Sequence, residues 1–153
     1  MQVLVSDKRL PYWAAGLSFV AGLVHMLATS EHFNEWWGYG TFFILIATCQ
    51  VFYGILLLVQ PWRYDDDGSP REDSARSARL FYLVGAVATG AAILLFIITR
   101  TVGIPFVGPD AGSVEPVTAL GMIAQVVEAG LCVCLVVLVK RSGGKSVETT
   151  AGG

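Results

Sequence analysis

Four long apolar stretches, separated by shorter polar segments, form the main pattern of the chain. They cover residues 10–29, 41–60, 80–99 and 117–139, and each is at least 20 residues long. As an α-helix, a stretch of about 20 residues covers about 30 Å, which is the thickness of the hydrocarbon core of a bilayer. Membrane-spanning β-strands need only about 10 residues and alternate in polarity, which these stretches do not. The pattern therefore predicts an all-α protein with four transmembrane helices.

The connections between these stretches are short, so consecutive helices must run antiparallel. We expect a single domain, residues 1–153, folded as an antiparallel four-helix transmembrane bundle. Pro61 follows the second stretch and Pro116 precedes the fourth, which agrees with helix ends at these points because proline disrupts a helix interior. The segment 142–153 is rich in small and polar residues, and we expect a disordered tail there.

The positive charges predict the orientation of the bundle. Nine of the ten Lys and Arg residues lie in the N-terminal segment, the second connection and the C-terminal segment, whereas Arg100 lies at the opposite side. Because cytoplasmic segments carry an excess of these residues, we expect both termini to be cytoplasmic and the protein to be integral to the plasma (inner) membrane. A cleaved signal peptide over residues 1–30 is the alternative. Its apolar run is longer than a usual signal sequence, and an odd number of crossings would separate the two termini.

Composition agrees with a membrane protein. Hydrophobic residues make up 54% of the 153 residues and charged residues 14%, and the mean hydropathy is +0.63. Soluble domains carry about 25% charged residues, which is more than this chain has. The net charge of −2 and the lack of a basic stripe exclude a nucleic-acid-binding protein. The expected partners are membrane lipids and either a partner subunit or further copies of the same chain.

Small and polar residues recur every three or four positions in each stretch, which predicts the faces that meet inside the bundle. Counted from the outer end of each helix, five polar residues fall about 12–17 Å deep and are expected to form one polar layer. These candidates for a polar core or ligand site are Ser18, Gln50, Thr89, Gln125 and Glu128. His25 is expected closer to the outer surface, about 6 Å deep.

Glu128 is the most informative residue of this layer. A carboxylate at the bilayer centre costs at least about 2.5 kcal/mol, and no Lys or Arg lies in the four stretches to compensate it. We therefore expect it to be protonated and hydrogen-bonded to Gln50, Thr89 or Ser18. It acts either as a proton or cation relay, or as a contact for a bound headgroup, or as a polar clasp that holds helices together.

Imidazoles and carboxylates gather toward the outer side, where the first loop reads SEHFNEWWGYG. They predict a transition-metal site formed by His25, Glu31, His32 and Glu115, because such ligands suit zinc, copper or iron. His25 and His32 are two helical turns apart, about 10 Å, and can share an ion only if the first helix ends near residue 30. The alternative is a buried neutral His25 beside a solvated interfacial loop. Haem is disfavoured, because Met122 alone lies near the depth of His25 on another stretch.

The second outer segment, TRTVGIPFVGPDAGSVEPV, contains too many turn-forming residues for a helix. Its apolar residues allow it either to fold back over the bundle as a lid or to lie flat on the interface. We expect Arg100 to hold this loop in place through an ion pair with Asp110 or Glu115, which would contribute at most about 1 kcal/mol.

No residue pattern of a known catalytic type is found. Cys132 and Cys134 point in different directions from a helix, and the chain has no CxxC motif, which excludes a disulfide oxidoreductase. No nucleophile, base and orienting residue occur together at motif spacing. A lipid-modifying activity that uses His25 and Glu31 is the enzymatic alternative.

Two sequences resemble those of small four-span bacterial membrane proteins of an uncharacterised family. They are RTVGIPFVGPDAGSVEPV, followed by an apolar helix, and EHFNEWWGYGTFF. The resemblance covers most of the chain and implies no activity, cofactor or catalytic residue. Because His, Glu and Trp residues gather on the outer side, we expect a non-enzymatic membrane protein whose outer loops and bundle mouth bind a ligand, a metal ion or a partner subunit. The alternative is a small oligomeric transporter, or a proton- or cation-conducting protein, that uses Glu128.

Overall fold

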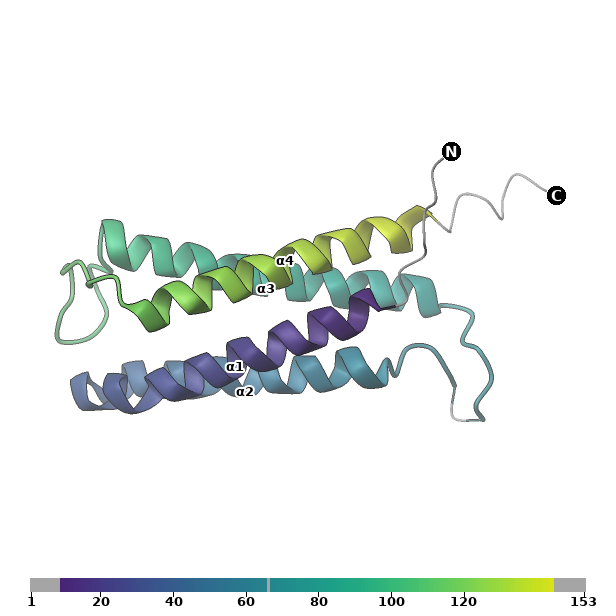
Figure 1. The fold of residues 1–153 in the computed structure, drawn as a ribbon, viewed down its shortest axis with the longest axis horizontal. Coiled ribbons are helices and arrows are strands. Elements are labelled where there is room, and N and C mark those ends of the chain that lie inside the picture. The colour runs from purple at the N-terminus through teal and green to yellow at the C-terminus, as the bar shows by residue number, and fades with distance from the viewer. Residues whose placement is uncertain (1–8, 66, 145–153) are drawn as a thin grey trace.

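The chain folds into four helices and no strand over the described residues, 9–65 and 67–144 of a computed structural model. Consecutive helices run antiparallel in one bundle (Figure 1). The elements are α1 (Leu10–Glu35), α2 (Trp37–Val59), α3 (Ser74–Thr101) and α4 (Ala119–Gly144). All four are long and apolar enough to cross a membrane. The predicted all-α four-helix bundle is confirmed.

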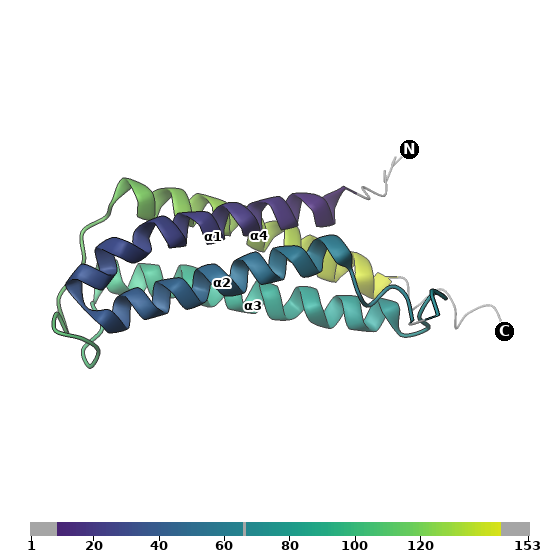
Figure 2. The same cartoon turned by 90° about the horizontal axis from the view of Figure 1, so that it is seen from below.

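The first residues of α1 and the last residues of α4 lie at the same end of the bundle (Figures 1 and 2). We call the opposite end the distal end. There Trp36 joins α1 to α2, and residues 102–118 join α3 to α4. The part of the predicted tail from residue 145 onward lies outside the described residues.

The four helices pack unequally around the bundle axis. α1 packs closely against α2 and against α4, and α3 packs against α4, whereas α2 and α3 are not a closely packed pair. Gly22 permits the close approach of α1 and α2. A Cβ atom there would lie 2.9 Å from Cγ2 of Val51 and 3.0 Å from the carbonyl oxygen of Ala47.

The half of the bundle nearer the termini is filled by a buried apolar core. Its members are Ala14, Ala15, Leu57, Trp62, Ala78, Tyr82, Ala86, Leu131, Leu135 and Leu138. Aromatic rings bridge α2 and α3 in this half. Tyr53 stacks on Phe81 with ring centroids 4.5 Å apart, and Trp62 lies 4.5 Å from the same ring. This half therefore leaves little space between the helices.

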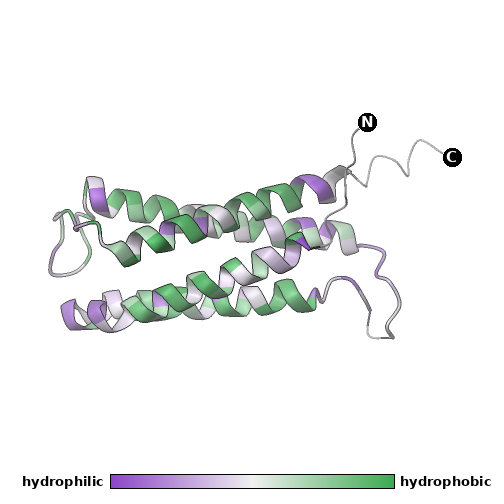
Figure 3. Cartoon of the chain, viewed as in Figure 1, coloured by the Kyte–Doolittle hydropathy of each residue, from purple (hydrophilic) through white to green (hydrophobic). Residues whose placement is uncertain are grey.

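The outward faces of the helices are mainly apolar, and hydrophilic residues gather near the helix ends (Figure 3). Large side chains such as Leu27, Phe52 and Val126 are exposed on these faces. In water such a continuous apolar surface would favour aggregation, whereas lipid tails cover it without cost. The surface therefore suits a membrane environment.

The prediction of a first outer loop is wrong, because the residues assigned to it are almost all helical. α1 continues to Glu35, Trp36 alone has an extended backbone, and α2 begins at Trp37. The chain reverses its direction at Trp36, and the two glycines that follow leave room for this tight turn. A Cβ at Gly38 would collide with the Trp36 ring, and one at Gly40 would collide with Phe33.

Candidate functional site

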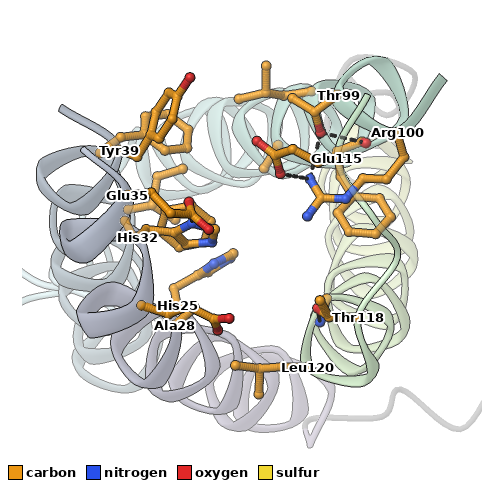
Figure 4. A pocket seen from close by; sticks show the side chains of 18 of the residues that line it. His25, Ala28, His32, Glu35, Tyr39, Thr99, Arg100, Glu115, Thr118 and Leu120 are labelled. Carbon is orange, nitrogen blue, oxygen red and sulfur yellow. Dashed lines mark hydrogen bonds and ion pairs between the residues drawn. The ribbon is translucent and has the colours of Figure 1, made fainter. Parts of the chain in front are cut away.

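A cavity of about 360 Å³ occupies the distal half of the bundle, and all four helices and the loop 102–118 contribute to its lining. Figure 4 shows side chains from α1 and α3, together with Glu115 of the loop, projecting toward this space. Five aromatic residues contribute to its wall, namely Trp36, Tyr39, Phe42, Phe43 and Phe96. Polar side chains gather in two places, at the buried inner end and at the distal rim. We call these places the floor and the rim.

The floor is a hydrogen-bond network around Glu128, which is 1% exposed. Nε2 of His25 lies 3.0 Å from its Oε1 atom, and Nε2 of Gln50 donates to the same oxygen over 3.0 Å. Nε2 of Gln125 donates to Oε2 over 3.2 Å. Ser18 extends the network, because its hydroxyl donates to the backbone carbonyl of Gln50 over 2.7 Å. Three helices, α1, α2 and α4, therefore meet through one carboxyl group.

The geometry of the floor suits a carboxylate. The side-chain amides of Gln50 and Gln125 can only donate through their nitrogen atoms, and they point at different oxygens of Glu128. The imidazole of His25 lies at hydrogen-bond distance from Oε1, so one proton can be shared along this contact. The protonation of Glu128 expected from the sequence stays a prediction.

The structure brings most of the predicted polar layer together. Of the three partners expected for Glu128, Gln50 contacts it directly and Ser18 contacts it through Gln50. Thr89 is buried on α3, and among the described residues no hydrogen bond links its side chain to the network. Its predicted contact with Glu128 is not formed, because α3 contributes no residue to the floor.

His25 as the partner of Glu128 was missed from the sequence because of the length of α1. With the helix ending at Glu35 instead of Thr29, His25 lies about 15 Å from the distal end instead of about 6 Å. Glu128 lies about 14 Å from the first residue of α4. The two residues are therefore at the same depth. The signal that could have shown it is the absence of Gly and Pro between Thr29 and Trp36, so nothing in this segment ends the helix.

Two pairs of ionisable side chains border the rim. Nδ1 of His32 lies 2.7 Å from Oε2 of Glu35 on the same face of α1, and the imidazole stacks on the Phe43 ring at 4.0 Å. On the other side, Nη1 of Arg100 lies 2.9 Å from Oε2 of Glu115. Figure 4 shows both pairs at the border of the same space.

Arg100 is held by more than its ion pair. Its guanidinium donates to the hydroxyl of Thr99 over 2.6 Å and lies 4.4 Å above the centre of the Phe96 ring. Of the two partners expected for it, Glu115 forms the pair, whereas Asp110 is exposed in the loop and forms no ion pair in the described part of the chain. The Nε atom of Arg100 is buried and lacks a partner among the described residues.

The loop 102–118 covers part of the cavity mouth. Ile104 and Val107 line the cavity, while Phe106 is 91% exposed and points away from it. The hydroxyl of Tyr39 donates to the carbonyl of Val107 over 3.0 Å, which links the loop to α2. Gly108 has φ of +77° beside this tyrosine, a conformation that favours glycine. The loop therefore covers part of the cavity mouth, as in the first of the two expected arrangements, and leaves Phe106 exposed.

The predicted metal ligands are not brought to one point. In residues 9–65 and 67–144 no three His, Cys, Asp or Glu side chains lie close enough together to hold a metal ion. His25 belongs to the floor, while Glu31, His32 and Glu115 lie at the rim. The cause is the continuous α1 helix, which keeps the two histidines two turns apart.

A second cavity of about 180 Å³ lies between α2 and α3, where the packing is loose. It borders the first cavity, because Ile46 and Ala92 line both. Thr89 and Gln50 provide polar groups there, and the Oε1 atom of Gln50 is buried without a partner among the described residues. The two cavities together follow the seam between α2 and α3.

Comparisons with protein-family models, with curated proteins and with solved structures found no match to this chain. The site is therefore interpreted from its own geometry.

Proposed function

We propose that this is a non-enzymatic integral membrane protein that binds an amphiphilic small molecule in the distal cavity. The observation that carries the proposal is the cavity itself, about 360 Å³ in volume and bordered by all four helices. Small-molecule sites in proteins usually measure about 300–1,000 Å³ and combine an apolar wall with a few convergent polar groups. The aromatic wall, the floor around Glu128 and the charged rim fit this description.

We further propose that the distal end faces the extracytoplasmic side of the plasma (inner) membrane. The positive charges near the termini and in the connection 60–73 support this orientation. Lipids are the proposed partners of the apolar outward faces. A partner subunit or a second copy of the chain, seated on those faces, is compatible with the same proposal.

Binding can be tested with three aryl probes of similar shape but different charge. These are tetraphenylphosphonium, triphenylphosphine oxide and tetraphenylborate, each titrated calorimetrically into the purified protein in detergent, with protein-free micelles subtracted. The proposal predicts that at least one probe binds saturably with one site per chain. It fails if none of the three binds saturably.

A pair of neighbouring alanines locates the binding. Ala92 lines both cavities, whereas Ala91 is exposed on the outward face of α3. Ala92→Phe should fill the space and abolish probe binding, while Ala91→Phe should leave it unchanged. Thermal melting checks that both variants fold. Equal binding by the two variants would contradict a site in the cavity.

Proton conduction is the second candidate, and the 3.0 Å contact between His25 and Glu128 favours it. His25 lines the cavity, so protons from the distal side can reach the pair. On the other side of the floor, the apolar core of Leu57, Leu131 and Leu135 opposes further passage. Glu128→Gln in proteoliposomes tests this function, since the proton flux should disappear with the carboxylate. A flux that persists, or that is absent from the unchanged protein, excludes it.

A further inference from the structure

We propose that the ligand of the distal cavity is a lipophilic organic cation; this inference rests on the proposed binding function. Three features of the lining argue for it independently: the balance of charges, the aromatic wall and the route of access from the membrane. Each concerns described residues that line one of the two cavities.

The cavity contains more acidic than basic groups. His25 and Glu128 contact each other directly, one imidazole against one carboxyl group, and this pair is left out of the balance. The remaining acidic lining residues are Glu31, Glu35 and Glu115, and the remaining basic ones are Arg100 and His32. Even with His32 protonated, the carboxylates are in excess, and with His32 neutral the excess grows. The field in the cavity therefore attracts cations and repels anions.

The wall contains aromatic rings, and the face of such a ring binds cations because its π-electrons are negative. The protein already uses this contact, since the guanidinium of Arg100 lies 4.4 Å above the Phe96 ring. Trp36, Tyr39 and Phe42 add further rings to the lining. An organic cation would gain both aromatic contact and electrostatic attraction here, whereas an isosteric neutral molecule would gain only the first.

The seam between α2 and α3 supplies the route for a lipophilic ligand. These helices are not closely packed, and the second cavity opens between them beside the first. Ile46 and Ala92 are shared by the two linings, so the second cavity lies directly beside the first along the proposed route from the bilayer. A strongly hydrated cation such as Na⁺ would not enter by this route, because lipid tails cannot solvate it.

The three aryl probes also test this inference. Tetraphenylphosphonium should bind at least about tenfold more tightly than triphenylphosphine oxide, a difference of about 1.4 kcal/mol, and tetraphenylborate should show no saturable binding. Binding of the neutral or anionic probe with equal or higher affinity would overturn the cation preference while leaving the proposed function intact. Failure of all three probes would contradict both.

Variants of single carboxylates show which charge is responsible. Glu31→Gln and Glu35→Gln each remove one carboxylate of this excess and should leave any binding of triphenylphosphine oxide unchanged. Both residues lie on an exposed part of the rim, so neither substitution disturbs a buried group. Each variant should weaken cation binding about twofold or more, since the charge is partly screened by solvent.

The matched control is Asp110→Asn, which removes one negative charge from the same end of the bundle but outside the cavity lining. It should leave the affinity for tetraphenylphosphonium unchanged. Equal weakening by the control and the cavity variants would show a general surface effect and overturn the inference, and so would unchanged cation binding in a folded cavity variant.

Discussion

Glu128 shows at the scale of a residue how a carboxyl group is accommodated deep in a helix bundle. Hydrogen-bonding groups of three residues, His25, Gln50 and Gln125, surround its two oxygens. A buried acceptor that loses its donors, or a buried donor that loses its acceptor, costs free energy because no water replaces the partner. The network therefore specifies how α1, α2 and α4 meet, in addition to any role in binding.

Substitutions of Glu128 and of His25 should lower the free energy of unfolding by unequal amounts. Glu128→Leu leaves both amides without their acceptor and the imidazole without its partner, and at about 1–3 kcal/mol for each unsatisfied buried group it should cost about 3 kcal/mol or more. His25→Leu leaves Glu128 with two amide donors and should cost about 1–3 kcal/mol. Thermal melting in detergent measures both. A larger loss for His25→Leu would contradict the central position of the carboxylate.

At the scale of the elements, the contact between α1 and α2 depends on a small residue at one position of α1. Gly22 faces Val51 and Ala47 across the contact, while Gly16 has no atom within 4 Å of the place where its Cβ would be. Small residues in membrane helices allow backbones to approach and gain van der Waals contact. The same amino acid therefore has a packing role at one position of α1 and none at the other.

Alanine substitutions at these two glycines make this difference measurable. Gly22→Ala should lower the melting temperature in detergent, because the added methyl lies 2.9 Å from Val51 and 3.0 Å from the Ala47 carbonyl. Overpacking of this kind typically costs about 1–3 kcal/mol. Gly16→Ala should be neutral or stabilising by up to about 1 kcal/mol, because alanine has the higher helix propensity. Equal melting temperatures would show that the close approach is not needed.

At the scale of the whole molecule, the bundle is filled at one end and hollow at the other. The buried apolar core lies in the half nearer the termini, and the 360 Å³ cavity lies in the distal half. This asymmetry follows from the side chains, because the buried leucines of the first half give way to polar groups at the floor of the cavity. The distal half can therefore hold a ligand, while the buried core of the other half stabilises the bundle.

The orientation of this asymmetric bundle can be measured by cysteine labelling in intact cells. Asp110 lies in the exposed distal loop, and Glu72 is exposed in the connection at the opposite end. An impermeant maleimide should label Asp110→Cys in intact cells and should label Glu72→Cys only after permeabilisation. The reverse result would invert the proposed orientation. Labelling of both positions in intact cells would contradict a bundle that crosses the membrane.

The sequence by itself determined the class of the protein. Length and hydropathy are properties of each stretch alone, and a bilayer requires a helix of about 20 apolar residues whatever its neighbours are. The antiparallel order followed from the short connections, and the residues of the polar layer followed from the cost of burying polar groups in lipid. None of these inferences depends on how far one helix is shifted along another.

The tertiary structure alone decided which polar groups meet. A contact such as His25–Glu128 depends on the axial position and the rotation of two helices, and one residue along a helix turns a side chain by about 100°. The continuation of α1 to Glu35 changed the depth of His25, removed the expected first loop and separated the expected metal ligands. The cavity and the loose seam between α2 and α3 are likewise products of packing, because they arise where side chains from different helices fail to fill the space between them.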